Sequence, residues 1–232
     1  MMLYPQRTPQ SDGGRGTGRL LSSMPPFDIP GSSGGEFGPG DPRSWMERQL
    51  FDRRIVLLSG PLNAEMANAV GVALMTLDAT GDDPVQLQID SSDGSIDAAM
   101  SLMDVIDLLG VPVHASCIGQ VAGPAVGVLA VCSHRTMAPH AHLRIFEPTI
   151  EVQGNAQQLR QLASLHLERW TVFCTRLAEI TGQPLDRLQE EASAGRYLSA
   201  DEAVAYRLVD EVATPDARMY RLPGRSFGFG PR

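Results

Sequence analysis

This chain contains no lysine: the 19 residues counted as Lys or Arg are all arginine. Without a lysine ammonium group, Schiff-base chemistry, a phosphate-binding P-loop and a serine–lysine dyad are excluded. Cysteine is scarce, and its three positions, Cys117, Cys132 and Cys174, show neither CxxC nor metal-ligand spacing. In their apolar surroundings they are predicted to be buried thiols of a reducing cytosol.

Long hydrophobic runs and net positive charge are absent too. No apolar stretch approaches the roughly 18 residues that a membrane helix needs, and the N-terminus has no apolar centre typical of a signal peptide. A formal net charge of -8 makes nucleic acid and anionic membranes poor partners. We therefore expect a cytoplasmic protein that binds neither a membrane nor nucleic acid.

The chain divides into one patterned region and two unpatterned ends. Residues 1–43 are rich in Gly, Pro and Ser and have no helical or strand period, which predicts a disordered segment. Residues 44–213 have the periodicity of a single domain, and the hydrophobic content of 43% is enough for a sizeable core. Residues 214–232 are expected to be a flexible tail.

Within the patterned region, strands and helices alternate. The apolar patterns predict strands at 54–58, 85–90, 111–118, 143–146 and 208–212, and helices at 44–51, 63–79, 95–110, 155–182 and from 199 onward. This alternation is typical of an α/β fold.

The stretch CIGQVAGPAVGVLAV, residues 117–131, is predicted to place the residue that a hydrolase would use as its nucleophile. It is expected to end a strand, turn through Gly119 and Gln120, and enter a small-residue helix that is buried on every side. Such a turn aims backbone N–H groups and one side chain into a cleft, where a hydrolase would have its nucleophile. Here that position is Gly123, followed by Pro124.

The longest expected helix has a wide apolar stripe that includes Trp170 and Phe173. A stripe of this width is typical of a helix that meets another subunit, so both residues are predicted assembly residues. Packing of the stripe on the helix's own domain is the alternative.

Six motifs carry a resemblance to a known family. The segments RRIVLLSG, IDSSDGSI, CIGQVAG, APHAHLRIFEP, ITGQPLDRL and GRYLSADEAVAYRLVDEV are similar, in order and spacing, to those of ClpP, the proteolytic subunit of the Clp ATP-dependent protease. The resemblance implies the ClpP/crotonase-like fold, a spiral of β-β-α units with a protruding handle helix through which two heptameric rings join. It also implies a cytosolic serine peptidase with a Ser-His-Asp triad.

The triad itself does not carry over. The family's serine position is Gly123, its histidine position is Phe146, and its aspartate position is Gly195. A glycine offers no hydroxyl, and a phenyl ring cannot accept a proton. All three catalytic roles are therefore vacant.

The oxyanion hole implied by the resemblance is also incomplete. One donor position is retained as Gly94, but the other is Pro124, which has no backbone N–H. Loss of one such donor typically slows a reaction ~10²–10³-fold. Asp93 adds a negative charge where an oxyanion would form, which opposes acyl transfer. Pro124 also weakens a crotonase-type alternative, because such enzymes need the equivalent pair of amides.

A displaced active site is the enzymatic alternative. Ser91, Ser92 and Ser95 are candidate nucleophiles, and His140 and His142 are candidate bases. Turn and cap positions explain the same serines without catalysis. Cys132 and His134 with the two later histidines have the ligand atoms for zinc, but they match no familiar zinc spacing.

The sequence therefore predicts a ClpP-like ring subunit without its own peptidase activity and without a cofactor. Its expected partners are further copies of itself or a catalytically intact ClpP paralogue. Docking of a Clp ATPase unfoldase is not assumed, because the region before the first helix is rich in Gly and Pro. An active hydrolase with a displaced nucleophile and a stand-alone scaffold or binding protein are the two rival functions.

Overall fold

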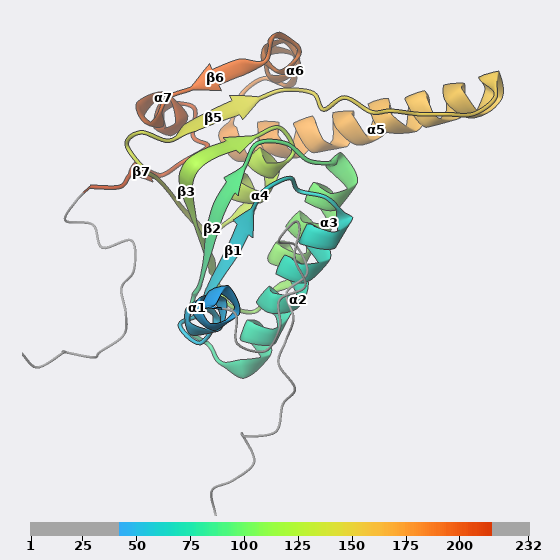
Figure 1. Ribbon diagram of the computed structural model, residues 1–232. Coiled ribbons are helices and arrows are strands. Elements are labelled where there is room, and N and C mark those ends of the chain that lie inside the picture. The colour runs from blue at the N-terminus through green and yellow to red at the C-terminus, as the bar shows by residue number, and fades with distance from the viewer. Residues whose placement is uncertain (1–41, 215–232) are drawn as a thin grey trace, which may run out of the picture.

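A computed structural model describes residues 42–214 of the chain (Figure 1). The segment predicted to be disordered and the predicted C-terminal tail lie almost entirely outside the described residues. The domain predicted between them is a mixed α/β structure in which one sheet is covered by helices.

The sheet has a parallel body and a branch. Five parallel strands follow in the order β1-β2-β3-β4-β7, with the bounds Ile55–Ser59, Val85–Ser91, Val113–Ala122, His134–Met137 and Glu211–Val212. The branch consists of β5 (His142–Ile145), which is parallel to β3, and β6 (Arg196–Leu198), which is antiparallel to β5.

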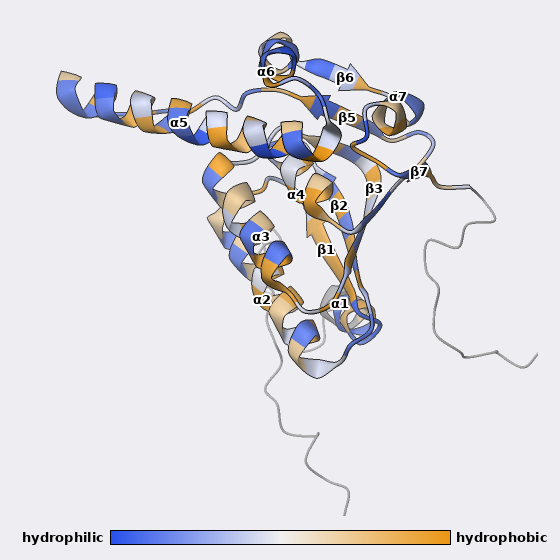
Figure 2. Ribbon diagram, turned by 180° about the vertical axis from the view of Figure 1, so that it is seen from behind, coloured by the Kyte–Doolittle hydropathy of each residue, from blue (hydrophilic) through white to orange (hydrophobic). Residues whose placement is uncertain are grey.

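Seven helices complete the described region: α1 Pro42–Phe51, α2 Ala64–Thr80, α3 Ile96–Leu108, α4 Ala125–Val131, α5 Ala156–Thr181, α6 Leu185–Ala194 and α7 Ala200–Ala205. Helices α2 and α3 lie side by side along the parallel strands, and α6 and α7 lie beside the branch (Figure 1). The hydrophobic residues concentrate on the central strands and the helices that cover them (Figure 2). None of the helices in the described part of the chain is both long and apolar enough to cross a membrane.

Local sequence signals account for most of these elements. In β2, Val85, Leu87 and Ile89 are fully buried, which confirms the predicted alternation. Helix α5 begins with the predicted cap, since the Asn155 side chain accepts hydrogen bonds from the first turn and Gln158 bonds back to the Asn155 N–H. Strands β4 and β6 and helix α6 were not predicted; the two strands are only four and three residues long, and the apolar pattern of α6 was not recognised.

Strand β3 differs from its prediction. The strand does not turn at Gly119 but continues to Ala122, because a bulge absorbs the glycine. Cys117 pairs with Ile89 and Val121 pairs with Ser91, so β3 advances by four residues where β2 advances by two. Gly119 has φ +89, a left-handed conformation that glycine adopts without strain.

The bulge creates the branch of the sheet. Before it, β3 pairs with β4 through His114 to Cys117, and after it β3 pairs with β5 through Gln120 to Ala122. Helix α4 follows directly, and its residues 125–130 are all buried, as predicted. The end of β3 therefore lies where the two parts of the sheet diverge.

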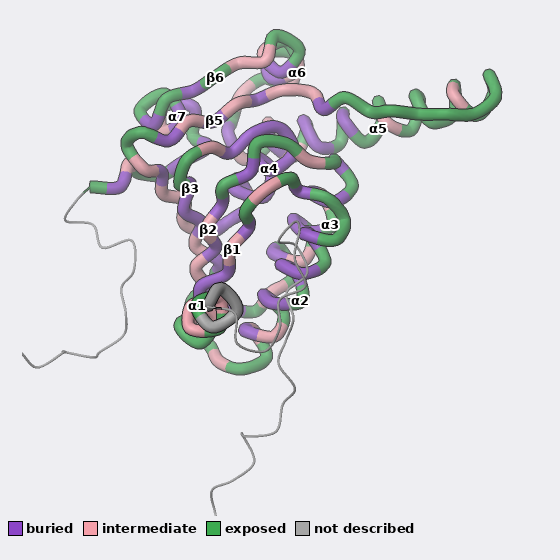
Figure 3. Tube along the Cα trace, viewed as in Figure 1, coloured by how far each residue is buried: buried purple, intermediate pink, exposed green. Residues whose placement is uncertain are grey.

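Helix α5 is packed on the domain along only part of its length. Its N-terminal half extends away from the rest of the molecule and is mostly exposed (Figures 1 and 3). Its C-terminal half contacts α3, α4 and α6. Ion pairs also join it to α3, including Arg176 Nη2 to Asp107 Oδ2 at 2.8 Å.

Trp170 and Phe173 lie in this packed half, which corrects their assignment as assembly residues. Their exposed fractions are 5% and 2%, and their rings stack on each other at a centroid distance of 5.6 Å. Phe173 also packs against Gly127 of α4, where a side chain would collide with the ring. The two aromatic residues belong to the core of the subunit. Four large apolar residues remain exposed on α5 instead: Leu162, Leu165, Leu167 and Val172.

Candidate functional site

The three positions aligned with the family's triad converge at the branch of the sheet. Gly123 follows β3, Phe146 follows β5, and Gly195 ends helix α6 with φ +69. The Gly123 N–H donates a 2.9 Å hydrogen bond to the Arg144 carbonyl, which holds the end of β3 against β5. The fold thus brings these positions to one cleft although they are far apart in the sequence.

The space beside Gly123 is filled by an aromatic ring. A Cβ atom built on Gly123 would lie 2.8 Å from Cζ and 2.9 Å from Cε1 of Phe146, closer than real carbon contacts. Gly123 also has φ +55, where a side chain is strained. The glycine and the phenylalanine therefore fit each other, and a side chain at position 123 would require the ring to move.

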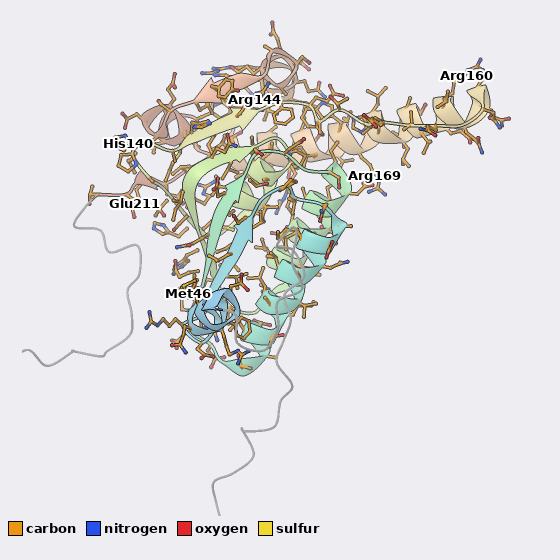
Figure 4. All side chains as sticks on the ribbon, viewed as in Figure 1. Met46, His140, Arg144, Arg160, Arg169 and Glu211 are labelled. Atoms are coloured by element: carbon orange, nitrogen blue, oxygen red, sulfur yellow. The ribbon has the colours of Figure 1, made fainter. Side chains whose placement is uncertain are left out.

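Arg144 occupies the space beside Gly195. A Cβ atom on Gly195 would lie 3.2 Å from Nη2 of Arg144. The guanidinium carbon lies 4.7 Å from the centroid of the Phe146 ring and 5.1 Å from that of Tyr197, both within the range of cation–π contact. Arg144 thus lies between the triad-equivalent positions, on strand β5 as Figure 4 shows.

The sequence interpretation missed Arg144, although a signal for it exists. In β5, Leu143 and Ile145 are buried, whereas His142 and Arg144 alternate with them and are half-buried. A strict alternation places His142, Arg144 and Phe146 on one face of the strand. This periodicity could have placed Arg144 next to Phe146 in the cleft.

The oxyanion-equivalent position is engaged by a neighbouring carboxylate. The Gly94 N–H donates a 2.7 Å hydrogen bond to Asp93 Oδ1. Leu62 holds this turn on both sides, because its N–H donates to the Asp93 carbonyl and its own carbonyl accepts from the Ser95 N–H. Pro124, the other position, opens helix α4 without an N–H to donate.

The candidate serines and histidines of a displaced site are not paired with one another. The Ser91 hydroxyl is buried and donates to the Asp93 carbonyl, and the Ser95 side chain accepts from Ala98 N as the cap of α3. His142 Nε2 lies 3.1 Å from Gln120 Oε1. Within residues 42–214, no serine hydroxyl is hydrogen-bonded to a histidine ring.

The cysteine and histidine residues considered for zinc are also separated by their contacts. The Cys132 thiol donates to the Val128 carbonyl, and His134 Nε2 lies 3.2 Å from Glu211 Oε1. The described residues contain no group of three or more His, Cys, Asp and Glu side chains arranged to hold a metal ion.

A cavity of about 700 Å³ opens beside Arg144, between β5, α5 and α6. Besides Arg144 and Phe146, polar residues that line it include Glu147, His166 and Ser193. His166 Nε2 lies 3.6 Å from Glu147 Oε1. A second cavity of about 320 Å³ shares Pro148, Thr149, Ile150 and His166 with the first and extends to Gly94. Neither Glu147 nor His166 was predicted as a site residue, because they approach each other only in the folded chain.

Comparison with known protein families shows which family this chain belongs to. The model of the Clp protease family matches residues 42–216, which is well over half of the sequence. The match confirms the resemblance seen in the motifs, and the mixed α/β architecture is consistent with the ClpP-like fold. The chain thus belongs to the Clp protease family, a family of serine peptidases whose members in general assemble into oligomers and work with ATPases.

Proposed function

We propose that this chain is a ClpP-like subunit that does not hydrolyse peptides itself and serves as a structural or regulatory subunit of a ring in ATP-dependent proteolysis. The observation that carries the proposal is the filled catalytic space. The Phe146 ring packs where a side chain of residue 123 would lie, and the Arg144 guanidinium lies beside position 195, 3.2 Å from where a Cβ of residue 195 would be.

The chemistry of the cleft supports the same proposal. Acyl transfer needs a nucleophile, a base and donors for the oxyanion, and Gly123 and Phe146 supply neither of the first two. Asp93 already accepts from the one retained donor, the Gly94 N–H. Removing the nucleophile or base of a serine peptidase slows it by roughly 10⁶-fold. Hydrolysis at this cleft is therefore not expected at a useful rate.

The catalytic half of the proposal is tested with the full-length chain and a fluorophosphonate probe. We expect no labelled serine and no cleavage of fluorogenic peptides. In a mixture with an active ClpP, only the active subunit should be labelled. Stoichiometric labelling of any serine in this chain would instead establish a displaced nucleophile.

The assembly half rests on the projecting part of α5. Leu165 and Leu167 are exposed there, on a helix half that has few contacts with its own domain (Figure 3). Exposed apolar side chains of this kind mark interaction surfaces. The partners we propose are further copies of this chain or a catalytically intact ClpP paralogue, with a Clp ATPase as partner of the assembled particle.

A pair of charged variants tests the assembly half. Leu165→Glu and Leu167→Glu should each reduce the particle mass in light scattering, because a charge would be buried at the contact. Thr175→Glu is the matched control, since Thr175 is exposed on the packed half of the same helix. An unchanged mass for both leucine variants, or a wild-type chain that stays monomeric with every Clp partner, would favour the stand-alone scaffold protein.

A further inference from the structure

Arg144 carries a charge that no described residue neutralises. No carboxylate within residues 42–214 lies within 4.0 Å of its guanidinium nitrogens, and its Nε is buried without a hydrogen-bond partner. By contrast, Arg135, Arg169, Arg176, Arg187 and Arg196 all form ion pairs with Asp or Glu. A half-buried cation with two ring contacts but no carboxylate or hydrogen-bond partner is only partly compensated, so it can still bind an anion from the adjacent cavity.

The surroundings of Arg144 hold the guanidinium in place and leave room beside it. The rings of Phe146 and Tyr197 contact it. Gly195 has no side chain to fill the adjacent space, and the 700 Å³ cavity begins at this point. Since Nε is buried, the terminal nitrogens Nη1 and Nη2 are the donors available to a ligand. Two parallel donors of this kind match the two oxygens of a carboxylate.

We propose that the cavity binds a carboxylate group at Arg144, either that of a small organic acid or the C-terminal carboxylate of a short peptide. The volume is within the range of small-molecule sites. A singly charged carboxylate fits better than a phosphate dianion, because Glu147 lines the same cavity and would repel the additional charge. This binding does not depend on the loss of peptidase activity, so it can be tested separately from the proposed function.

The first experiment is isothermal titration of the full-length chain with three probes. These are an acetylated tri-alanine peptide with a free carboxylate, the same peptide as its C-terminal amide, and propionate, which carries a single charge. If the ligand is a peptide terminus, the acid binds roughly 10- to 100-fold more tightly than the amide, the range expected for a hydrogen bond to a charged group. If the ligand is a small acid, propionate binds and the peptide acid does not. Equal binding of acid and amide, or no binding of any probe at millimolar concentration, would overturn the proposal.

Variants then identify the residue that binds. Arg144→Met should lose at least the same factor in affinity, while Met still fills the space between the two rings. Arg160→Met is the control, because Arg160 is exposed at the far end of α5 (Figure 4). Unchanged affinity in a folded Arg144→Met variant would refute the assignment.

A matched pair at Gly195 gives a test that leaves Arg144 in place. Gly195→Asp would put a carboxylate next to Nη2 and compete with the ligand, whereas Gly195→Asn has the same shape without the charge. Both residues tolerate the left-handed backbone of position 195 better than other side chains do. We expect Gly195→Asp to abolish binding and Gly195→Asn to keep most of it. Equal affinities in the two variants would contradict a carboxylate at Arg144.

Discussion

Gly123→Ser tests the packing of the filled cleft. Two unfavourable effects are expected at once. The left-handed backbone at φ +55 costs about 1–2 kcal/mol for a non-glycine residue. The new Cβ would lie 2.8 Å from Phe146 Cζ, and moving a packed ring typically costs about 1–3 kcal/mol. The sum, about 2–5 kcal/mol, is a large fraction of the roughly 5–15 kcal/mol that stabilises a typical domain.

Thermal unfolding followed by circular dichroism measures this loss. For a domain of this size we expect Tm to fall by roughly 5–15 °C. Gly123→Ala is the matched control, because it adds the same Cβ without a hydroxyl and should lose nearly as much. Adding Phe146→Ala to Gly123→Ser should destabilise the chain less than the sum of the two single changes, since the collision is removed. A Tm within about 1 °C of wild type for Gly123→Ser would refute the packing argument. The same variant should remain inactive towards peptides, because no base is supplied with the hydroxyl.

Three further predictions concern stability and reactivity. Burial acts to raise the pKa of Glu191, but hydrogen bonds from Tyr206 and Arg187 outweigh it and hold that pKa below its ordinary value of 4.5. A carboxyl group whose pKa is lowered by folding stabilises the folded state above its unfolded pKa, and this stabilisation is lost as the pH falls. Glu191→Gln should therefore reduce the free energy of unfolding in urea by about 1–2 kcal/mol at pH 7 and by progressively less below pH 4.5. A reduction that stays constant down to pH 3 would contradict this. Burial raises the pKa of all three cysteine thiols to about 12, so iodoacetamide at pH 8 should modify none of them in the native chain and all of them in urea, as mass spectrometry would show; alkylation of any native thiol would disprove their burial. Trp170→Ala should lower the free energy of unfolding by about 3–5 kcal/mol, whereas Leu167→Ala should change it by less than about 1 kcal/mol. Similar losses in the two variants would contradict the burial of Trp170 in the core.

Much of the fold could be predicted because its signals are local. Asn155 and Ser199 cap their helices within one turn, and the alternation in 85–90 reflects burial on one face of a strand. Gly119 was misread because a glycine in an apolar run is compatible with both a turn and a bulge. Only the pairing of β3 with two different neighbours distinguishes them.

The site was predicted in part for the same reason. The residue types at positions 123, 146 and 195 were sufficient to predict the loss of the triad's side chains. They could not indicate that Arg144 lies beside Gly195, because that contact and the contact with Tyr197 join β5 to the end of α6 and to β6. The apolar pattern of α5 likewise does not indicate which half of the helix packs on its own domain. The apolar stripe was identified correctly, but Trp170 was assigned to a subunit interface although it is buried in the core.

The projecting half of α5 has a consequence for the energetics of association. Its first turns have a capping box but little tertiary packing, and a helical segment of that length is only marginally stable in water by itself. Backbone amides around Leu162 should therefore exchange with deuterium far faster than those around Leu177, which is buried in the core. Any surface that covers these turns must also offset the conformational entropy of ordering them, about 1–2 kcal/mol per residue. If the proposed subunit contact covers the helix tip, ordering of the tip and association are linked equilibria, and the protection of these amides should rise with subunit concentration.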